Sequence, residues 1–142
     1  MAIRKATAAW QGSFMEGKGE LVLESGVFKG PYDFRARSTD GTGMTNPEEL
    51  IAAAHAGCFT MAFSATLGKS GFTPGKINTE ARVHLQPSGG GFVIPRIELI
   101  MSASVPGIDA DKFQELAASA KVNCPVSKAL AGCEITLQAT LV

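Results

Sequence analysis

A long uncharged stretch, Leu50 to Leu67, follows a helix-start signal and constrains the fold most strongly. Asn46 is a favourable N-cap, Pro47 suits the first helical position, and Glu49 can reach back to the backbone of the cap. These 18 residues are long enough for a membrane span, but six are alanines and several others are polar, so the hydropathy is modest. We therefore predict a buried core helix from Pro47 to about Leu67.

Shorter patterns on both sides of this stretch indicate strands and two further helices. Alternation and turn residues predict strands at Lys5–Gln11, Glu20–Glu24, Tyr32–Arg37, Ile77–Leu85, Phe92–Ser104 and Glu134–Leu141. Asp109 is expected to cap a second helix that ends near Val122, and Pro125–Leu130 forms a short third helix. This order predicts an α+β fold, with an antiparallel sheet packed on a long buried central helix and a second helix. With no repeat or linker in the chain, we expect a single domain over residues 1–142.

The charge balance argues against several classes of function. The chain has 13 Lys and Arg against 13 Asp and Glu and no basic run, which argues against binding to nucleic acid or to an anionic membrane. Charged residues make up only 18% of the chain, too few to cover its surface well, so we expect an oligomer. The N-terminus lacks the apolar core of a signal peptide and the three cysteines are an odd number, so we expect a cytoplasmic location.

The three cysteines have different surroundings. Cys58 lies near the middle of the predicted helix, where the helix dipole does not activate it. It is either a small core residue or, with His55 three residues before it, part of the Cys–His pair of a thiol hydrolase. Cys124 falls at the N-cap of the short third helix, where unpaired N–H groups favour a thiolate, although a cap cysteine can also be incidental. Cys133 begins the last strand with no positive charge close in sequence, and we expect a structural role.

Motifs for a metal, a nucleotide or a serine nucleophile are absent. The chain has no Cys-x-x-Cys, and its two histidines, His55 and His84, lie on different predicted elements, so no metal site is expected. It also has no dinucleotide fingerprint, no phosphate loop and no Gly-x-Ser-x-Gly, and its glycine runs at 17–19 and 89–91 are typical of turns. We therefore expect no cofactor.

Two cysteine motifs, in order along the chain, resemble those of a known family. The run Thr45–Phe59 resembles the first cysteine motif of osmotically inducible protein C, and Cys124–Leu130 resembles the second. The chain thus resembles the OsmC side of the OsmC/organic hydroperoxide resistance (Ohr) family. Further matching landmarks extend through nearly the whole chain: Trp10 with Gly12, Glu24–Val27, Pro31 and Tyr32 with Phe34, Gly71–Pro74, and Val105–Asp109.

The resemblance implies a thiol peroxidase that reduces organic hydroperoxides to alcohols in oxidative or osmotic stress defence. By position, Cys58 matches the peroxidatic cysteine, Cys124 the resolving cysteine, and Glu48 and Arg37 their acidic and basic partners. The resemblance further implies that Cys58 is oxidised to a sulfenic acid and then forms a disulfide with Cys124. It also implies that an external dithiol of lipoyl type reduces this disulfide. It also implies an intertwined homodimer with active sites at the interface. Arg35, two residues away, would replace Arg37 if the register were shifted.

The predicted helix creates a conflict with this site. Glu48 and Cys58 are ten residues apart, which on one unbroken helix is about 15 Å along the axis and about 80° around it. One arginine is then poorly placed to contact both residues of the same chain. A two-fold dimer resolves the conflict if Glu48 comes from the partner chain, and a later helix start or a bend at Gly57 would also reduce it.

Two other functions fit the residues without the resemblance. A thiol hydrolase that uses Cys58 and His55 would turn over esters without needing Cys124. A non-enzymatic dimeric binding protein would use all three cysteines for packing. A peroxide-consumption assay with a dithiol reductant separates these alternatives from a peroxidase.

Overall fold

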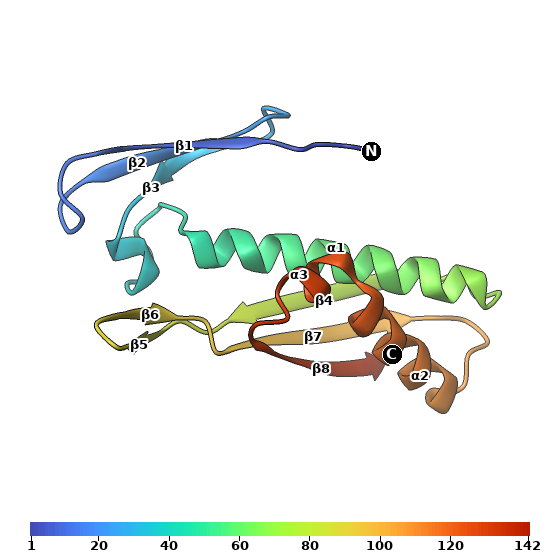
Figure 1. Cartoon of the computed structure of the whole chain (residues 1–142). Coiled ribbons are helices and arrows are strands. Elements are labelled where there is room, and N and C mark those ends of the chain that lie inside the picture. Colours follow the sequence, from blue (N-terminus) through green and yellow to red (C-terminus); the bar gives the residue numbers. More distant parts are fainter. The chain divides into compact units, whose positions relative to one another are not determined.

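The computed structural model describes residues 1–142, which divide into two compact units, residues 1–50 and 51–142 (Figure 1). The helices and strands follow an α+β order, as predicted. The chain forms β1 (Ala6–Gln11), β2 (Lys18–Leu23), β3 (Lys29–Tyr32), the 3-10 helix η1 (Arg35–Arg37), α1 (Pro47–Lys69), β4 (Lys76–Val83), β5 (Gln86–Ser88), β6 (Gly91–Val93), β7 (Arg96–Ser104), α2 (Ala110–Asn123), α3 (Pro125–Ala129) and β8 (Glu134–Leu141).

The first unit is an antiparallel sheet in the order β1-β2-β3, followed by η1. The predicted strand Tyr32–Arg37 is wrong, because β3 ends at Tyr32 and the arginines lie in η1. The side chain of Asp33 explains the difference, since its Oδ1 accepts the backbone N–H of Ala36 at 2.9 Å. An aspartate that bonds the backbone three residues on favours a turn over an extended strand, and alternation alone does not reveal it.

The second unit contains a mixed sheet in the order β4-β7-β8 and the small hairpin β5-β6. Strand β4 pairs with β7 in antiparallel fashion, but β8 pairs with β7 in parallel, which differs from the predicted antiparallel sheet. The reason is the helical connection through α2 and α3, which returns the chain to the end of the sheet where β7 began. The predicted strand Phe92–Ser104 is also divided, because Pro95 interrupts it between β6 and β7.

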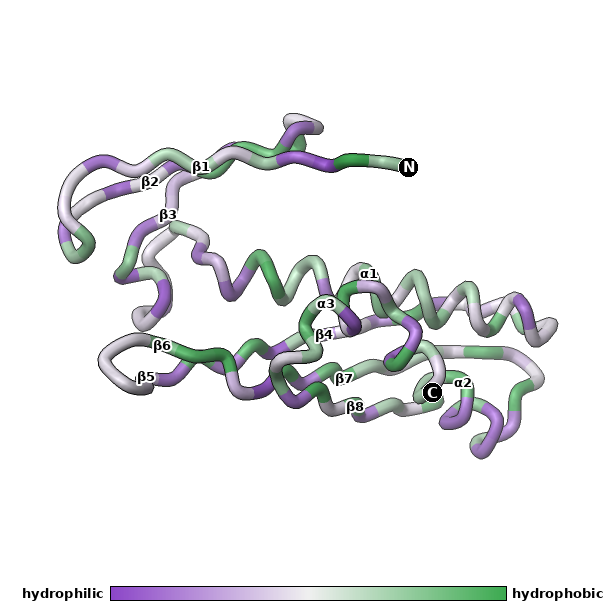
Figure 2. Tube along the Cα trace, viewed as in Figure 1, coloured by the Kyte–Doolittle hydropathy of each residue, from purple (hydrophilic) through white to green (hydrophobic).

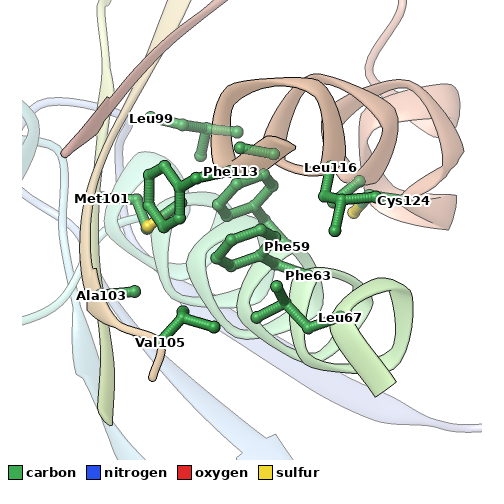
Figure 3. Close-up of a cluster of buried hydrophobic side chains, with 12 residues drawn as sticks. Phe59, Phe63, Leu67, Leu99, Met101, Ala103, Val105, Phe113, Leu116 and Cys124 are labelled. Carbon is green, nitrogen blue, oxygen red and sulfur yellow. The ribbon is translucent and has the colours of Figure 1, made fainter. Parts of the chain in front are cut away.

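The core of the second unit lies where α1 and α2 pack on one face of β7 (Figure 3). Phe63 of α1 meets Phe113 of α2 edge to face, with ring centroids 5.5 Å apart. The other members come from the same three elements, the turn that follows β7 and the start of α3: Phe59, Leu67, Leu99, Met101, Ala103, Val105, Leu116, Ala117, Ala120 and Cys124. This cluster holds the middle of α1, where Cys58 lies, against the beginning of α3.

Helix α1 begins as its sequence predicts, because Asn46 Oδ1 accepts the backbone N–H of Glu49 at 2.8 Å. It is long and apolar enough to cross a membrane by length and composition, and it is coloured mainly white and green in Figure 2. A soluble core helix passes the same test, and Phe59, Phe63 and Leu67 bury one side of α1 completely. Its burial is one-sided, however, since Met61 is 75% exposed in the single chain.

Candidate active site

Two cysteines from distant parts of the chain meet in the second unit. Cys58 comes from the middle of α1 and Cys124 from the N-cap of α3, and the two thiols interact, so that each changes the pKa of the other. Neither forms a disulfide. Cys124 is completely buried, whereas Cys58 is partly exposed. A reactant from solvent therefore reaches Cys58 before it reaches Cys124.

The beginning of α3 surrounds Cys124 with hydrogen-bond donors. Burial opposes ionisation of this thiol, but hydrogen bonds from Cys58, from the backbone and side chain of Ser127 and from the Val126 N–H outweigh it and lower the pKa of Cys124. Burial and the hydrogen bond with Cys124 raise the pKa of Cys58, which the Val126 N–H opposes. The pair therefore shares its first thiolate, and the second thiol ionises only with difficulty.

The partner of His55 is a serine and not a cysteine. Its Nε2 lies 2.8 Å from Ser127 Oγ, and its Nδ1 is buried without a partner. The ring is fully buried, and this burial lowers the pKa of His55. The Cys–His pair considered from the sequence is not formed, because the ring nitrogens of His55 do not bond Cys58. Sequence reasoning missed Ser127, whose only signal is its place in the motif that begins at Cys124.

In the first unit, Arg37 and Glu48 form a bidentate ion pair. Arg37 Nη2 donates to Glu48 Oε1 at 2.6 Å, and its Nε donates to Oε2 at 3.1 Å. The hydrogen bond with Glu48 raises the pKa of Arg37 although burial opposes it, so the guanidinium stays charged. Asn46 Nδ2 donates to the carbonyl of Ala36 at 2.7 Å and ties η1 to the beginning of α1. Arg35 instead pairs with Glu16 on the exposed surface, at 3.0 Å.

An aromatic hollow lies beside this ion pair in the same unit. Trp10 and Tyr32 approach with ring centroids 5.5 Å apart over Gly19, where an added Cβ would stand 2.3 Å from the Tyr32 ring. Only glycine fits at this position of β2, because a side chain there would push the Trp10 and Tyr32 rings apart. The hollow has a volume of about 320 Å³ and is lined by Trp10, Phe14, Tyr32, Asp33, Phe34, Arg37 and Pro47. It can hold an apolar group next to a fixed positive charge.

Cys133 stands apart from the thiol pair. Its Sγ donates to the carbonyl of Leu130 at 3.1 Å, in the turn that leads into β8. The structural role expected of Cys133 from the sequence stays a prediction. His84 also has a local partner, Glu98, at 2.5 Å, and no group of three or more His, Cys, Asp or Glu side chains is placed to hold a metal ion.

The structure places Glu48 and Cys58 on the same continuous helix. Helix α1 begins at Pro47 and continues through Gly57 to Lys69, so a later helix start does not bring the two residues together. The helical rise separates them by about 15 Å along the axis. Each chain thus presents a thiol pair in its second unit and an Arg37–Glu48 pair in its first.

Comparison with known proteins identifies the family. Residues 39–138 match the family model described as "OsmC-like protein". The chain is 49% identical to peroxiredoxin OsmC of Escherichia coli (strain K12) over 135 residues, which cover 94% of this chain and 93% of the relative. It is 35% identical to an organic hydroperoxide resistance protein of Xanthomonas axonopodis pv. citri (strain 306), over 72% of this chain and 68% of the relative.

A solved structure supports the same assignment. The organic hydroperoxide resistance protein OhrB of Bacillus subtilis superposes with a TM-score of 0.68 at 27% identity, covering 97% of this chain and 98% of that protein. The likeness therefore extends through both units. This chain belongs to the OsmC-like protein family.

Proposed function

We propose that this protein is a thiol-dependent peroxidase that reduces organic hydroperoxides to alcohols, with Cys58 as the peroxidatic and Cys124 as the resolving cysteine. The observation that carries the proposal is the contact between a partly exposed Cys58 and a buried Cys124 at the beginning of α3. The names of the Escherichia coli and Xanthomonas relatives support the same activity.

The reaction consumes one hydroperoxide for each pair of thiols. The Cys58 thiolate attacks the terminal peroxide oxygen, the O–O bond breaks, and the leaving alkoxide takes a proton to become an alcohol. The Cys124 thiolate then attacks the sulfur of the Cys58 sulfenic acid, and the departing hydroxide takes a proton to form water. Two exchanges with an external dithiol, for which we propose a lipoyl-type reductant, restore both thiols and oxidise that dithiol.

Arg37 supplies the positive charge that this chemistry needs. The pKa of Cys58 is raised by its own surroundings, so the thiolate needs a cation from elsewhere. A guanidinium close to the sulfur lowers a thiol pKa by roughly 1–3 units and donates to the peroxide oxygens as charge develops. Glu48 holds the Arg37 fork in one orientation. The aromatic hollow beside it takes the apolar part of the hydroperoxide.

The complete site is proposed to form in a homodimer. The Arg37–Glu48 pair of one chain would then serve the Cys58–Cys124 pair of the other, which resolves the separation along α1. The exposed apolar side of α1 at Met61 and the low charged fraction of the chain support such a dimer. We further propose that the enzyme acts in the cytoplasm, where a reducing environment regenerates thiols.

Peroxide consumption tests the activity directly. The protein is expected to reduce cumene hydroperoxide continuously in the presence of dihydrolipoamide. Cys124→Ser should consume about one equivalent per chain and then slow sharply, because its sulfenic acid has no resolving thiol. Ferrous–xylenol orange measures the remaining hydroperoxide. Hydrolysis of p-nitrophenyl acetate that persists in Cys124→Ser, without peroxide turnover by the unmodified protein, would favour the thiol hydrolase instead.

A mixing experiment tests the shared site. Cys58→Ser chains and Glu48→Gln chains are unfolded together, refolded and assayed for peroxide reduction. If each site takes Glu48 from the partner chain, about one site in four regains an intact pair of residues. Cys58→Ser mixed with Cys124→Ser is the matched control, since both thiols come from one chain and no heterodimer regains the pair. Activity no higher than the two separate variants, with heterodimers shown by mass spectrometry, would contradict the shared site.

A further inference from the structure

We propose that Ser127 and His55 form a hydrogen-bond relay that orients a hydroxyl toward Cys124 and makes it the attacking group in disulfide formation. Both are positioning residues for the second step of the cycle, so the inference rests on the proposed peroxidase function. The geometry separates this step from the first, because the relay touches Cys124 and not Cys58.

Both members of the relay are removed from water. His55 is 0% exposed and Ser127 is 6% exposed, and their polar atoms lie 2.8 Å apart. Ser127 is the third residue of α3, where its backbone N–H is one of the donors that a helix leaves unpaired. Ser127 lies three residues after Cys124, the N-cap of the same helix, and its backbone N–H and hydroxyl both favour the Cys124 thiolate and lower the pKa of Cys124. Burying an imidazole and a hydroxyl is unfavourable unless they are paired, and here the pairing leads to a reactive thiol.

Proton counting defines the direction of the relay. Ser127 has one O–H, so it can donate either to the Cys124 sulfur or to His55 Nε2. When it donates to a thiolate, its oxygen is free to accept the N–H of His55 Nε2. That arrangement places the imidazole proton on Nε2 and leaves Nδ1 unprotonated, and Nδ1 is the nitrogen without a partner. Because burial lowers the pKa of His55, the ring does this as a neutral donor.

Within one chain, no charged side chain substitutes for the relay at Cys124. From α1, the groups that face this region are Cys58 and His55. From α2, Lys121 directs its ammonium to the carbonyl of Ile135, and Lys128 of α3 is exposed. The groups of the same chain that lower the pKa of Cys124 are therefore neutral: the Cys58 thiol, the Ser127 hydroxyl and the N–H groups of Val126 and Ser127. Of these, only the Ser127 hydroxyl has a further partner that fixes its orientation.

Single-turnover kinetics test the relay. The reduced protein is mixed with one equivalent of cumene hydroperoxide, and the sulfenic acid (trapped with dimedone) and the disulfide are followed by mass spectrometry. Ser127→Ala and His55→Leu should form the sulfenic acid within about twofold of the normal rate. They should convert it to disulfide roughly 10-fold to 100-fold more slowly, as expected for the loss of a hydrogen bond to a charged group. Ser127→Thr and His55→Gln, which keep a hydroxyl and an N–H donor, should restore much of the rate.

A second measurement does not depend on turnover. In the Cys58→Ser, Cys133→Ser protein, the thiolate absorbance near 240 nm reports Cys124 alone. Ser127→Ala should move its titration midpoint upward by about one pH unit, because the thiolate loses a donor. Thr66→Val is the matched control, since it removes a hydroxyl of α1 that bonds only the carbonyl of Ala62, at 2.8 Å. Its midpoint should not move.

The outcomes separate the two hypotheses. If the unmodified protein forms no Cys58 sulfenic acid, the peroxidase proposal fails. If it does, but Ser127→Ala forms disulfide at the normal rate with an unmoved titration midpoint, the relay is overturned while the peroxidase stands. Ser127→Ala removes one oxygen and places a strong helix former in α3, so it decides the matter even where His55→Leu does not fold.

Discussion

Cys58→Ser is expected to abolish hydroperoxide reduction, by at least about 10³-fold, because a hydroxyl at this position is not ionised near neutral pH and cannot be oxidised in the same way. The same assay with cumene hydroperoxide and dihydrolipoamide measures the loss. Cys124 cannot replace Cys58, since Cys124 is completely buried. Among the single substitutions, loss of the Cys58 sulfur should therefore reduce the peroxidase activity the most.

Cys133→Ser is the matched control for this variant. It also exchanges sulfur for oxygen, but in a turn where the group donates only to the carbonyl of Leu130. Its activity should stay within about twofold of the unmodified protein. Steady turnover by Cys58→Ser would reject Cys58 as the peroxidatic residue, and a comparable loss in Cys133→Ser would mean that the third thiol also takes part.

Arg37→Met is expected to slow the oxidation of Cys58 by about 10²-fold or more, because both the activating charge and the peroxide donors are lost. The sign of the pH effect follows directly. Removing a cation raises the pKa of Cys58, so the thiolate forms only at higher pH. The rate of alkylation by iodoacetamide against pH should therefore shift upward, and peroxide reduction should decline most at neutral pH.

Arg35→Met provides the comparison for Arg37→Met. It removes the same charge two residues away, but Arg35 pairs with Glu16 on the exposed surface. Exposed ion pairs contribute little, so its alkylation profile and its activity should remain close to those of the unmodified protein. An unchanged profile in Arg37→Met, or an equal shift in Arg35→Met, would contradict the role of Arg37.

Local signals in the sequence predicted some elements well and missed others for identifiable reasons. Asn46 and Pro47 mark the beginning of α1, and Asp109 caps α2 by accepting the backbone N–H of Lys112 at 2.8 Å. The strand predicted across the arginines failed because the Asp33 side chain accepts the backbone N–H of Ala36, which residue alternation does not show. The parallel pairing of β8 depends on where the helical connection returns the chain, which is a long-range property.

The candidate site shows the same division between local and distant information. The N-cap position of Cys124 was predictable because Pro125 follows it, and the lowered pKa of Cys124 agrees with that position. Its contact with Cys58 was implied only by the family resemblance. The bond between His55 and Ser127 joins residues 72 positions apart, and neither carries a local signal for the other. The sequence around a histidine on an apolar helix does not show whether the partner of that histidine is a cysteine or a serine.

The placement of Cys58 on α1 and Cys124 on α3 has a consequence for heat resistance. A bond between them would tie together a loop of about 67 residues, which by chain entropy stabilises the folded protein by about 4 kcal/mol. Such a loop includes strands β4 and β7, the hairpin β5-β6 and helix α2. The folded protein would then be more stable against unfolding after each oxidation and less stable after each reduction. The oxidised enzyme, before its reductant arrives, would then also be the form that best resists heat or denaturant.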